Sequence, residues 1–131
     1  MKRILIVDDN DTIADLSELI LHTAGFDCTK VNSGTRCLDI IRESYRNNSN
    51  YDLILLDIAM PQYSGLDVIK AMKAEGYLDH NKVVFFTASS ATNTDFEELK
   101  KLGAIDCMKK PFSKAELLSF VKRYTEVKNE Q

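Results

Sequence analysis

The chain has 131 residues, of which 44% are hydrophobic and 28% charged, and its formal net charge at pH 7 is −3. This length suits one domain with its own core, and the apolar fraction is too high for a disordered chain. The slight acidity, without a basic block, argues against direct nucleic-acid binding, and no apolar run approaches the length of a membrane span. We therefore expect a folded domain without membrane insertion.

Three cysteines, an odd number, stand at positions 28, 37 and 107 without the spacing of a metal site. Small buried thiols in a reducing compartment are the simplest interpretation of such cysteines. The apolar stretch near the N-terminus ends after four residues at Asp8, which is too short for a signal peptide. These features predict a cytoplasmic location.

Short apolar segments recur along the chain and predict five strands. The clearest three are almost continuous in apolar residues, a pattern typical of parallel strands covered on both faces. The second and fifth segments in chain order are weaker candidates. The predicted strands are Ile4–Val7, Cys28–Val31, Leu53–Leu56, Val83–Phe86 and Asp106–Lys109.

Each predicted strand is followed by a segment with helical spacing, and glycines stand at the joins. For the first helix we expect Asp11 or Thr12 as the cap. The expected apolar faces are, in order, Ile13, Leu16, Ile20 and Ala24; Leu38 and Ile41; Leu66, Ile69 and Met72; Phe96, Leu99 and Leu102; and Leu117, Val121 and Tyr124.

This alternation predicts an α/β fold of five βα units, a doubly wound parallel five-stranded sheet with helices on both faces. Five units are too few for an eight-stranded barrel. In an open sheet of this kind, functional groups lie beyond the carboxyl ends of the strands.

Polar residues end four of the apolar strands. Asp8 and Asp9 follow the first strand, Asp57 ends the third, Thr87 ends the fourth and Lys110 follows the fifth. An acid at a strand end is often only a helix cap, but all five residues are expected at one edge of the sheet.

Three carboxylates at that edge repel one another, and Lys110 supplies only one positive charge. Oxygen ligands suit Mg²⁺, which binds through a few carboxylates and retains water. We predict a Mg²⁺ site formed by Asp8, Asp9, Asp57 and the backbone carbonyl of Ala59. A structural cation, or an acidic pocket without a metal, is the alternative.

An ionised aspartate beside a metal can also act as a nucleophile toward a phosphoryl group. Asp57 is the candidate acceptor. Lys110 is expected to contact the phosphoryl oxygens as a point charge, and Thr87 to donate its hydroxyl.

The quoted motifs resemble a known family. Val7-Asp8-Asp9-Asn10, Leu55–Gly65 around Asp57, Phe86-Thr87-Ala88 and Lys109-Lys110-Pro111-Phe112 resemble the signature of receiver domains of two-component response regulators, here of the single-domain chemotaxis type. The resemblance covers nearly the whole chain, and we expect a receiver domain over residues 1–125 followed by a polar tail at 126–131.

The resemblance implies a flavodoxin-like fold with strand order 2-1-3-4-5 and a cis Lys110–Pro111 bond. It implies that Asp57 is phosphorylated by a sensor histidine kinase or a phosphotransfer protein. Asp8 and Asp9 would then form the acidic pair at Mg²⁺, and Thr87 would be the switch hydroxyl. Such a protein is a phosphoacceptor that takes part in its own phosphorylation and dephosphorylation, and not an enzyme for an external substrate.

The family usually has an aromatic residue three positions before the lysine, where this chain has Cys107. Either another side chain fills that space, or coupling from Asp57 to the output face follows another route; packing is the simpler role for Cys107, and a redox-sensitive switch the alternative. The output face in this family corresponds here to Phe96–Leu102, Asp106–Lys109 and Lys114–Tyr124, a locally basic surface that would bind a downstream protein.

Three alternative functions remain at this point. A Mg²⁺-dependent phosphohydrolase with an aspartate nucleophile needs an acid or base two residues after it, where this chain has Ala59. A flavin-binding module needs a phosphate loop after the first strand, which the sequence lacks. A receiver that never accepts phosphate is the third alternative.

Overall fold

The structure is a computed structural model that describes residues 1–88 and 91–126. In chain order the elements are β1 (Arg3–Val7), α1 (Asp11–Thr23), β2 (Asp27–Val31), α2 (Gly34–Arg46), β3 (Leu53–Asp57), α3 (Gly65–Glu75), the 3-10 turn η1 (Tyr77–Asp79), β4 (Val83–Thr87), α4 (Asn93–Lys101), β5 (Asp106–Lys109) and α5 (Lys114–Thr125). All five predicted strands are present. The strand–helix alternation of the sequence is therefore confirmed.

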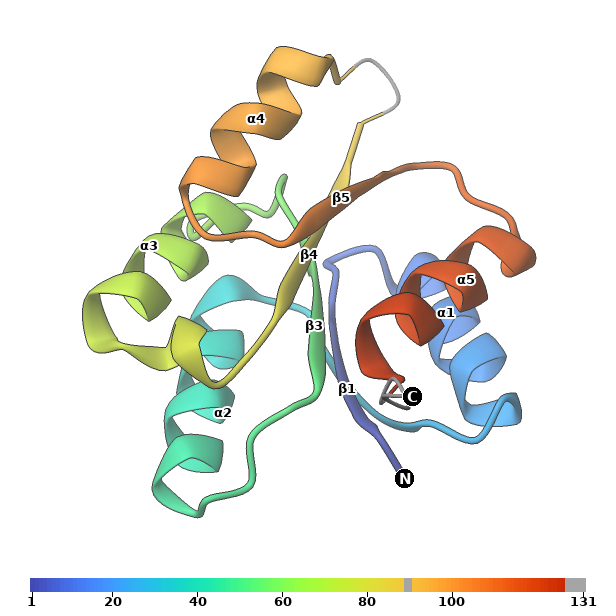
Figure 1. The fold of residues 1–131 in the computed structure, drawn as a ribbon, viewed down its shortest axis with the longest axis horizontal. Helices are drawn as coiled ribbons and strands as arrows, with labels where there is room; N and C mark the ends of the chain where they lie inside the picture. Colours follow the sequence, from blue (N-terminus) through green and yellow to red (C-terminus); the bar gives the residue numbers. More distant parts are fainter. Residues whose placement is uncertain (89–90, 127–131) are drawn as a thin grey trace, which may run out of the picture.

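The strands form one sheet in the order β2-β1-β3-β4-β5, and every neighbouring pair is parallel. Helices α1 and α5 cover one face, and α2, α3 and α4 cover the other, as Figure 1 shows. The fold class and the strand order are those that the resemblance implied. Because the strands are parallel, their carboxyl ends share one edge.

Two cores lie on the two faces of the sheet, and alternate strand residues contribute to each. Leu5 and Val7 of β1 join the core beneath α2, α3 and α4, whereas Ile4 and Ile6 join the core beneath α1 and α5. Side chains in a strand alternate between faces, so burial on both sides requires an unbroken apolar run. This is why the central strands carry the strongest sequence signal.

The packed face of α1 differs from the predicted one. Ala14, Ser17, Ile20 and Leu21 are buried, whereas Leu16 is 50% exposed and Ala24 is exposed. The helix approaches the sheet through the small side chains of Ala14 and Ser17, which rotates its face by about one residue. Of the expected stripe, Ile20 is buried as predicted and Ile13 is half-buried, whereas the placement of Leu16 and Ala24 on the packed face was wrong.

Each helix begins with a side-chain cap at the carboxyl edge of the sheet. The capping residues are Asn10, Ser33, Ser64, Thr92 and Ser113, and each accepts a hydrogen bond from a backbone N–H three residues later. For α1 the cap is Asn10, and the expectation of Asp11 or Thr12 was wrong. Of the expected tail at 126–131, residues 127–131 lie outside the described residues.

Candidate phosphoacceptor site

Asp8 is the most deeply buried acid of the carboxyl edge, with no exposed surface. One carboxylate oxygen accepts the backbone N–H of Asn10 at 2.9 Å, and the other accepts from the Lys110 ammonium at 2.6 Å. A buried charge requires this kind of pairing. Asp8 therefore fixes the turn into α1 as well as the position of Lys110.

Asp57 ends β3 and is 6% exposed. Its Oδ1 lies 3.3 Å from the Lys110 ammonium, so one lysine bridges two carboxylates. One carboxylate oxygen from each of Asp8, Asp9 and Asp57 lies within 4.8 Å of the others, although Asp9 is exposed. The three acids and the lysine expected from the sequence thus meet in space.

The pKa of Asp57 is raised to about 6. Desolvation by burial is the main cause, and the nearby negative charge of Asp8 adds to it, whereas Lys110 acts in the opposite direction. Without a metal ion, the edge thus holds more negative charge than one ammonium group balances.

The donor set fits a hard divalent cation. Three carboxylate oxygens converge, one acid is solvent-exposed, and Mg²⁺ prefers a small number of such ligands together with water. The Ala59 carbonyl belongs to the exposed turn after Asp57, and its role as a ligand remains a prediction.

The turn between β3 and α3 is held against Asp57 by Gly65. The Gly65 N–H donates to the Ile58 carbonyl at 2.9 Å, and a Cβ at Gly65 would lie 2.3 Å from the Asp57 carbonyl oxygen. Only glycine permits this approach. The sequence marked Gly65 as a helix boundary, but it gave no sign that the residue packs against the end of β3.

Thr87 and Lys110 are joined through the backbone, since the Lys110 N–H donates to the Thr87 carbonyl at 2.8 Å. The Thr87 hydroxyl is buried and donates to the Met108 carbonyl at 3.5 Å, a long hydrogen bond. The Lys110–Pro111 bond is cis, as the resemblance implied. Thr87 therefore lies at the edge with a weakly engaged donor.

Aromatic residues support Lys110 in a way that the sequence did not reveal. The rings of Phe86 and Phe112 stack with centroids 5.2 Å apart, and the Lys110 ammonium lies 5.7 Å from the centre of the Phe86 ring. The cation–π contact with Phe86 helps to hold the Lys110 ammonium at this edge, and the stacked Phe112 supports the Phe86 ring. Strand-end polarity identified Lys110, whereas its aromatic support depends on the tertiary fold.

Cys107 is buried in the core beneath α2, α3 and α4. Burial raises the pKa of its thiol to about 11, so the thiol is protonated at neutral pH. These surroundings are those of a packing residue, the simpler of the two roles considered. All three cysteines are free thiols.

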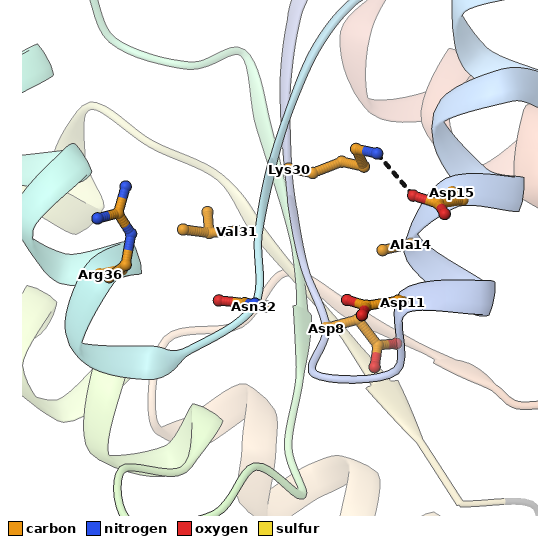
Figure 2. Close-up of a pocket in the computed structure, with 8 residues that line it drawn as sticks. All are labelled: Asp8, Asp11, Ala14, Asp15, Lys30, Val31, Asn32 and Arg36. Atoms are coloured by element: carbon orange, nitrogen blue, oxygen red, sulfur yellow. Dashed lines mark hydrogen bonds and ion pairs between the residues drawn. The ribbon is translucent and has the colours of Figure 1, made fainter.

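A hollow of about 300 Å³ lies on the β2 side of Asp8, between α1 and the start of α2. Figure 2 shows the residues that line it. Lys30 of β2 is turned toward α1, where its ammonium lies 2.6 Å from Asp15 and 3.3 Å from Glu18. The Lys30 charge is thus paired with α1. Asp8, which lines the same hollow, pairs with Lys110 instead.

The family model for the response regulator receiver domain matches residues 4–122. The chain belongs to the response regulator receiver domain family. It is therefore a signalling module of two-component systems, and phosphorylation and Mg²⁺ binding are typical of its family. None of the helices that the structure describes combines the length and apolar character required to cross a membrane.

Individual relatives agree with this assignment. The polar-differentiation response regulator DivK of Brucella ovis is 32% identical over 123 residues, which cover 94% of this chain and 95% of DivK. A CpxR homolog of Haemophilus influenzae, a transcriptional regulatory protein, is 31% identical over 93% of this chain but 49% of its own length. The chain thus spans about half of that relative.

The receiver domain of the Francisella response regulator 1452 has a similar structure. The TM-score is 0.83 at 27% identity, and the match covers 95% of this chain and 97% of that domain. The receiver fold therefore accounts for almost the whole described chain.

Proposed function

We propose that Asp57 accepts a phosphoryl group from a phosphohistidine of a sensor kinase or phosphotransfer protein, in a reaction that requires Mg²⁺. The observation that carries this proposal is the convergence of the Asp8, Asp9 and Asp57 carboxylates within 4.8 Å, with Lys110 paired to two of them. Family membership supports the same chemistry.

Asp8, Asp9, Asp57 and the Ala59 carbonyl would hold the metal ion. When bound, Mg²⁺ offsets the charge of the acids and of the incoming phosphoryl oxygens. An Asp57 oxygen attacks phosphorus, the new O–P bond forms as the P–N bond to histidine breaks, and the electron pair of that bond returns to the imidazole. Lys110, already 3.3 Å from Asp57, supplies a positive charge to the phosphoryl oxygens.

Phosphorylation adds negative charge at Asp57 and so creates a demand for hydrogen-bond donors. The Thr87 hydroxyl suits this demand, because its bond to Met108 is long and exchangeable. A shift of Thr87 would move the start of α4, and with it the face formed by α4, β5 and α5. Exposed lysines at positions 100, 101, 109, 114 and 122 make this face suitable for a downstream protein.

In this proposal the protein is a phosphoacceptor that assists its own phosphorylation and dephosphorylation. A phosphohydrolase is disfavoured because the exposed Ala59, two residues after Asp57, offers no acid or base. The cytoplasmic location remains a prediction that the free cysteines support. The absence of direct nucleic-acid binding is likewise a prediction.

Intact-mass spectrometry with phosphoramidate as a P–N donor tests the proposal. Wild type should gain the mass of one phosphoryl group in Mg²⁺ and none in EDTA, and Asp57→Asn should gain none while remaining folded by circular dichroism. Asp79→Asn is the matched control, because Asp79 is an exposed acid at the opposite edge of the sheet.

Two results would contradict the proposal. Labelling of Asp57→Asn equal to that of wild type would place the acceptor elsewhere. Wild type that binds Mg²⁺ but never gains mass would be a receiver that does not accept phosphate. Steady turnover of p-nitrophenyl phosphate would instead indicate a phosphohydrolase.

A further inference from the structure

A pocket of about 440 Å³ lies between α3 and α4 and reaches the acceptor edge. Leu66 of α3 and Leu99 and Leu102 at α4 form its apolar wall, and Asp57 and Thr87 line the end nearest the site. Pockets of this volume with mostly apolar walls are typical of small-ligand sites. The volume of this pocket therefore lies within the range of small-ligand sites.

Small side chains explain why this space is open. Ala59, Ala88 and Ala91 each contribute only a methyl group to the lining. Helix α4 buries Leu99 alone among its residues, whereas α3 buries Gly65, Val68, Ile69 and Met72. The pocket thus follows from a helix that is not packed closely against its neighbour.

The charges that line the pocket are all negative. Asp95 and Glu98 of α4 join Asp57, and no lysine, arginine or histidine lines it among the described residues. Hydrogen bonds from the Thr92 backbone N–H and hydroxyl lower the pKa of Asp95, which keeps that carboxylate ionised at neutral pH. Among the described residues, Glu98 pairs with Lys101, an exposed lysine whose ammonium lies 3.7 Å from the Glu98 carboxylate. The lining therefore complements a cation.

We propose that the pocket between α3 and α4 binds a small amphipathic organic cation, an aromatic or aliphatic body with one ammonium group. The body would contact the leucine wall, and the ammonium group would lie toward Asp95 and Glu98. Because Asp57 and Thr87 line the same pocket, we also expect the bound cation to change the Mg²⁺ affinity of the acceptor site. This last step rests on the proposed function, but binding itself does not.

Phenethylammonium is a suitable probe, with 2-phenylethanol as its neutral analogue and 3-phenylpropionate as its anionic analogue. Titrations of the full chain, ¹⁵N-labelled and in EDTA without phosphoryl donor, should give saturable amide shifts in α3 and α4, with a Kd on the order of 1 mM. The alcohol should bind several-fold more weakly and the carboxylate not at all. Equal binding of all three, or no saturable shift with the amine, would overturn the proposal.

Glu98→Gln should weaken phenethylammonium binding about 3–5-fold and leave 2-phenylethanol unchanged. Glu97→Gln is the matched control, because Glu97 is an exposed neighbour on α4 that does not line the pocket. Ala91→Leu should abolish binding of both by filling the space. Equal effects of the two glutamate variants would overturn the charge assignment.

Two further arms complete the test. The capped peptide Phe-Lys-Phe should bind no better than phenethylammonium, and tighter binding would overturn the small-molecule assignment in favour of a protein partner. The Mg²⁺ Kd should change at least twofold when the amine is present, and an unchanged value would overturn the link to the acceptor. Because the binding arms contain neither metal nor donor, their result does not depend on whether Asp57 is phosphorylated.

Discussion

Helices α3 and α4 lie on the same side of the sheet and begin alike, yet they are held very differently. Each follows a strand that ends in a site residue, and each starts with a capping box, at Ser64 and at Thr92. Helix α3 buries four residues, whereas α4 buries only Leu99. The two helices therefore share local sequence chemistry but not tertiary packing.

The ends of β3 and β4, which precede these helices, also differ in how firmly their last residues are held. Asp57 is held by Lys110 and by the close approach of Gly65. Within the described residues, the Thr87 hydroxyl makes one hydrogen bond, a long one to the Met108 carbonyl. Asp57, the proposed acceptor, is thus on the more firmly held side, and Thr87, the proposed switch hydroxyl, is on the side with fewer buried contacts. Elements with few buried contacts are those that open locally and change conformation.

Matched truncations give the largest expected difference between the two helices. Ile69→Ala on α3 should lower the free energy of unfolding by about 4 kcal/mol, because Ile69 is fully buried. Leu99→Ala on α4 should cost about 2 kcal/mol, the low end of the range for buried leucines, because Leu99 already lines a pocket. Urea unfolding measures both, and equal losses would contradict the proposed difference in packing.

The lysine bridge provides the next test. In EDTA at pH 7.5, Lys110→Met should lower the free energy of unfolding by about 3 kcal/mol, since it leaves the buried Asp8 carboxylate without its cation. Lys109→Met, at an exposed neighbouring position, should change it by less than about 1 kcal/mol. Similar losses of unfolding free energy in the two variants would show that the Lys110 bridge to Asp8 and Asp57 does not stabilise this part of the fold.

The raised pKa of Asp57 predicts a pH dependence with a definite sign. Because its pKa in the fold is about 6, above the usual 3.8, the folded state holds this proton more tightly than the unfolded chain. The stability that results is complete below pH 4 and is lost as the pH rises through 6. In EDTA, wild type should therefore lose about 1–3 kcal/mol relative to Asp57→Asn between pH 4 and 7.5.

This measurement uses urea unfolding of both proteins at each pH, so that the titration of other carboxylates cancels in the difference. Added Mg²⁺ should remove the loss in wild type. A difference that is independent of pH, or one of opposite sign, would contradict the charge balance described for the site.

Removal of the helix caps is expected to have the smallest and most local effect on stability. Ser64→Ala and Thr92→Ala each remove a side-chain oxygen that accepts a backbone N–H, a loss of about 1 kcal/mol per helix. We expect Ser64→Ala to lower global stability by this amount. Thr92→Ala should instead speed amide hydrogen exchange mainly within α4, and a purely global effect would show that α4 does not open separately.

The sequence predicted the fold and the convergence of the three acids with Lys110, because both depend on features that are local or periodic. The apolar runs before Asp8, Asp57 and Thr87 specify buried parallel strands, and parallel strands bring their ends to one edge. Strand order and the cis bond at Lys110 came from resemblance to a family, because the residues alone did not determine them. The expected roles of Asp57, Thr87 and Lys110 followed from their positions at the strand ends, and the resemblance implied the same roles.

What could not be predicted depends on tertiary distance. The face of α1 is decided by how closely Ala14 and Ser17 let the helix approach the sheet, which hydropathy does not record. Gly65 is recognisable as a boundary, but its contact with the Asp57 carbonyl requires knowledge of the path of the turn. The loose packing of α4 was likewise not visible, since its apolar residues Phe96, Leu99 and Leu102 have ordinary helical spacing.

The capped amino ends of all five described helices have an electrostatic consequence. Aligned peptide dipoles give the amino end of a helix a partial positive charge. Every helix here starts from the edge that carries Asp57, so the backbone contributes a positive potential there that no side-chain substitution removes. For an arriving dianionic phosphoryl group, this backbone potential would partly offset the repulsion from the three carboxylates, before any loop has rearranged.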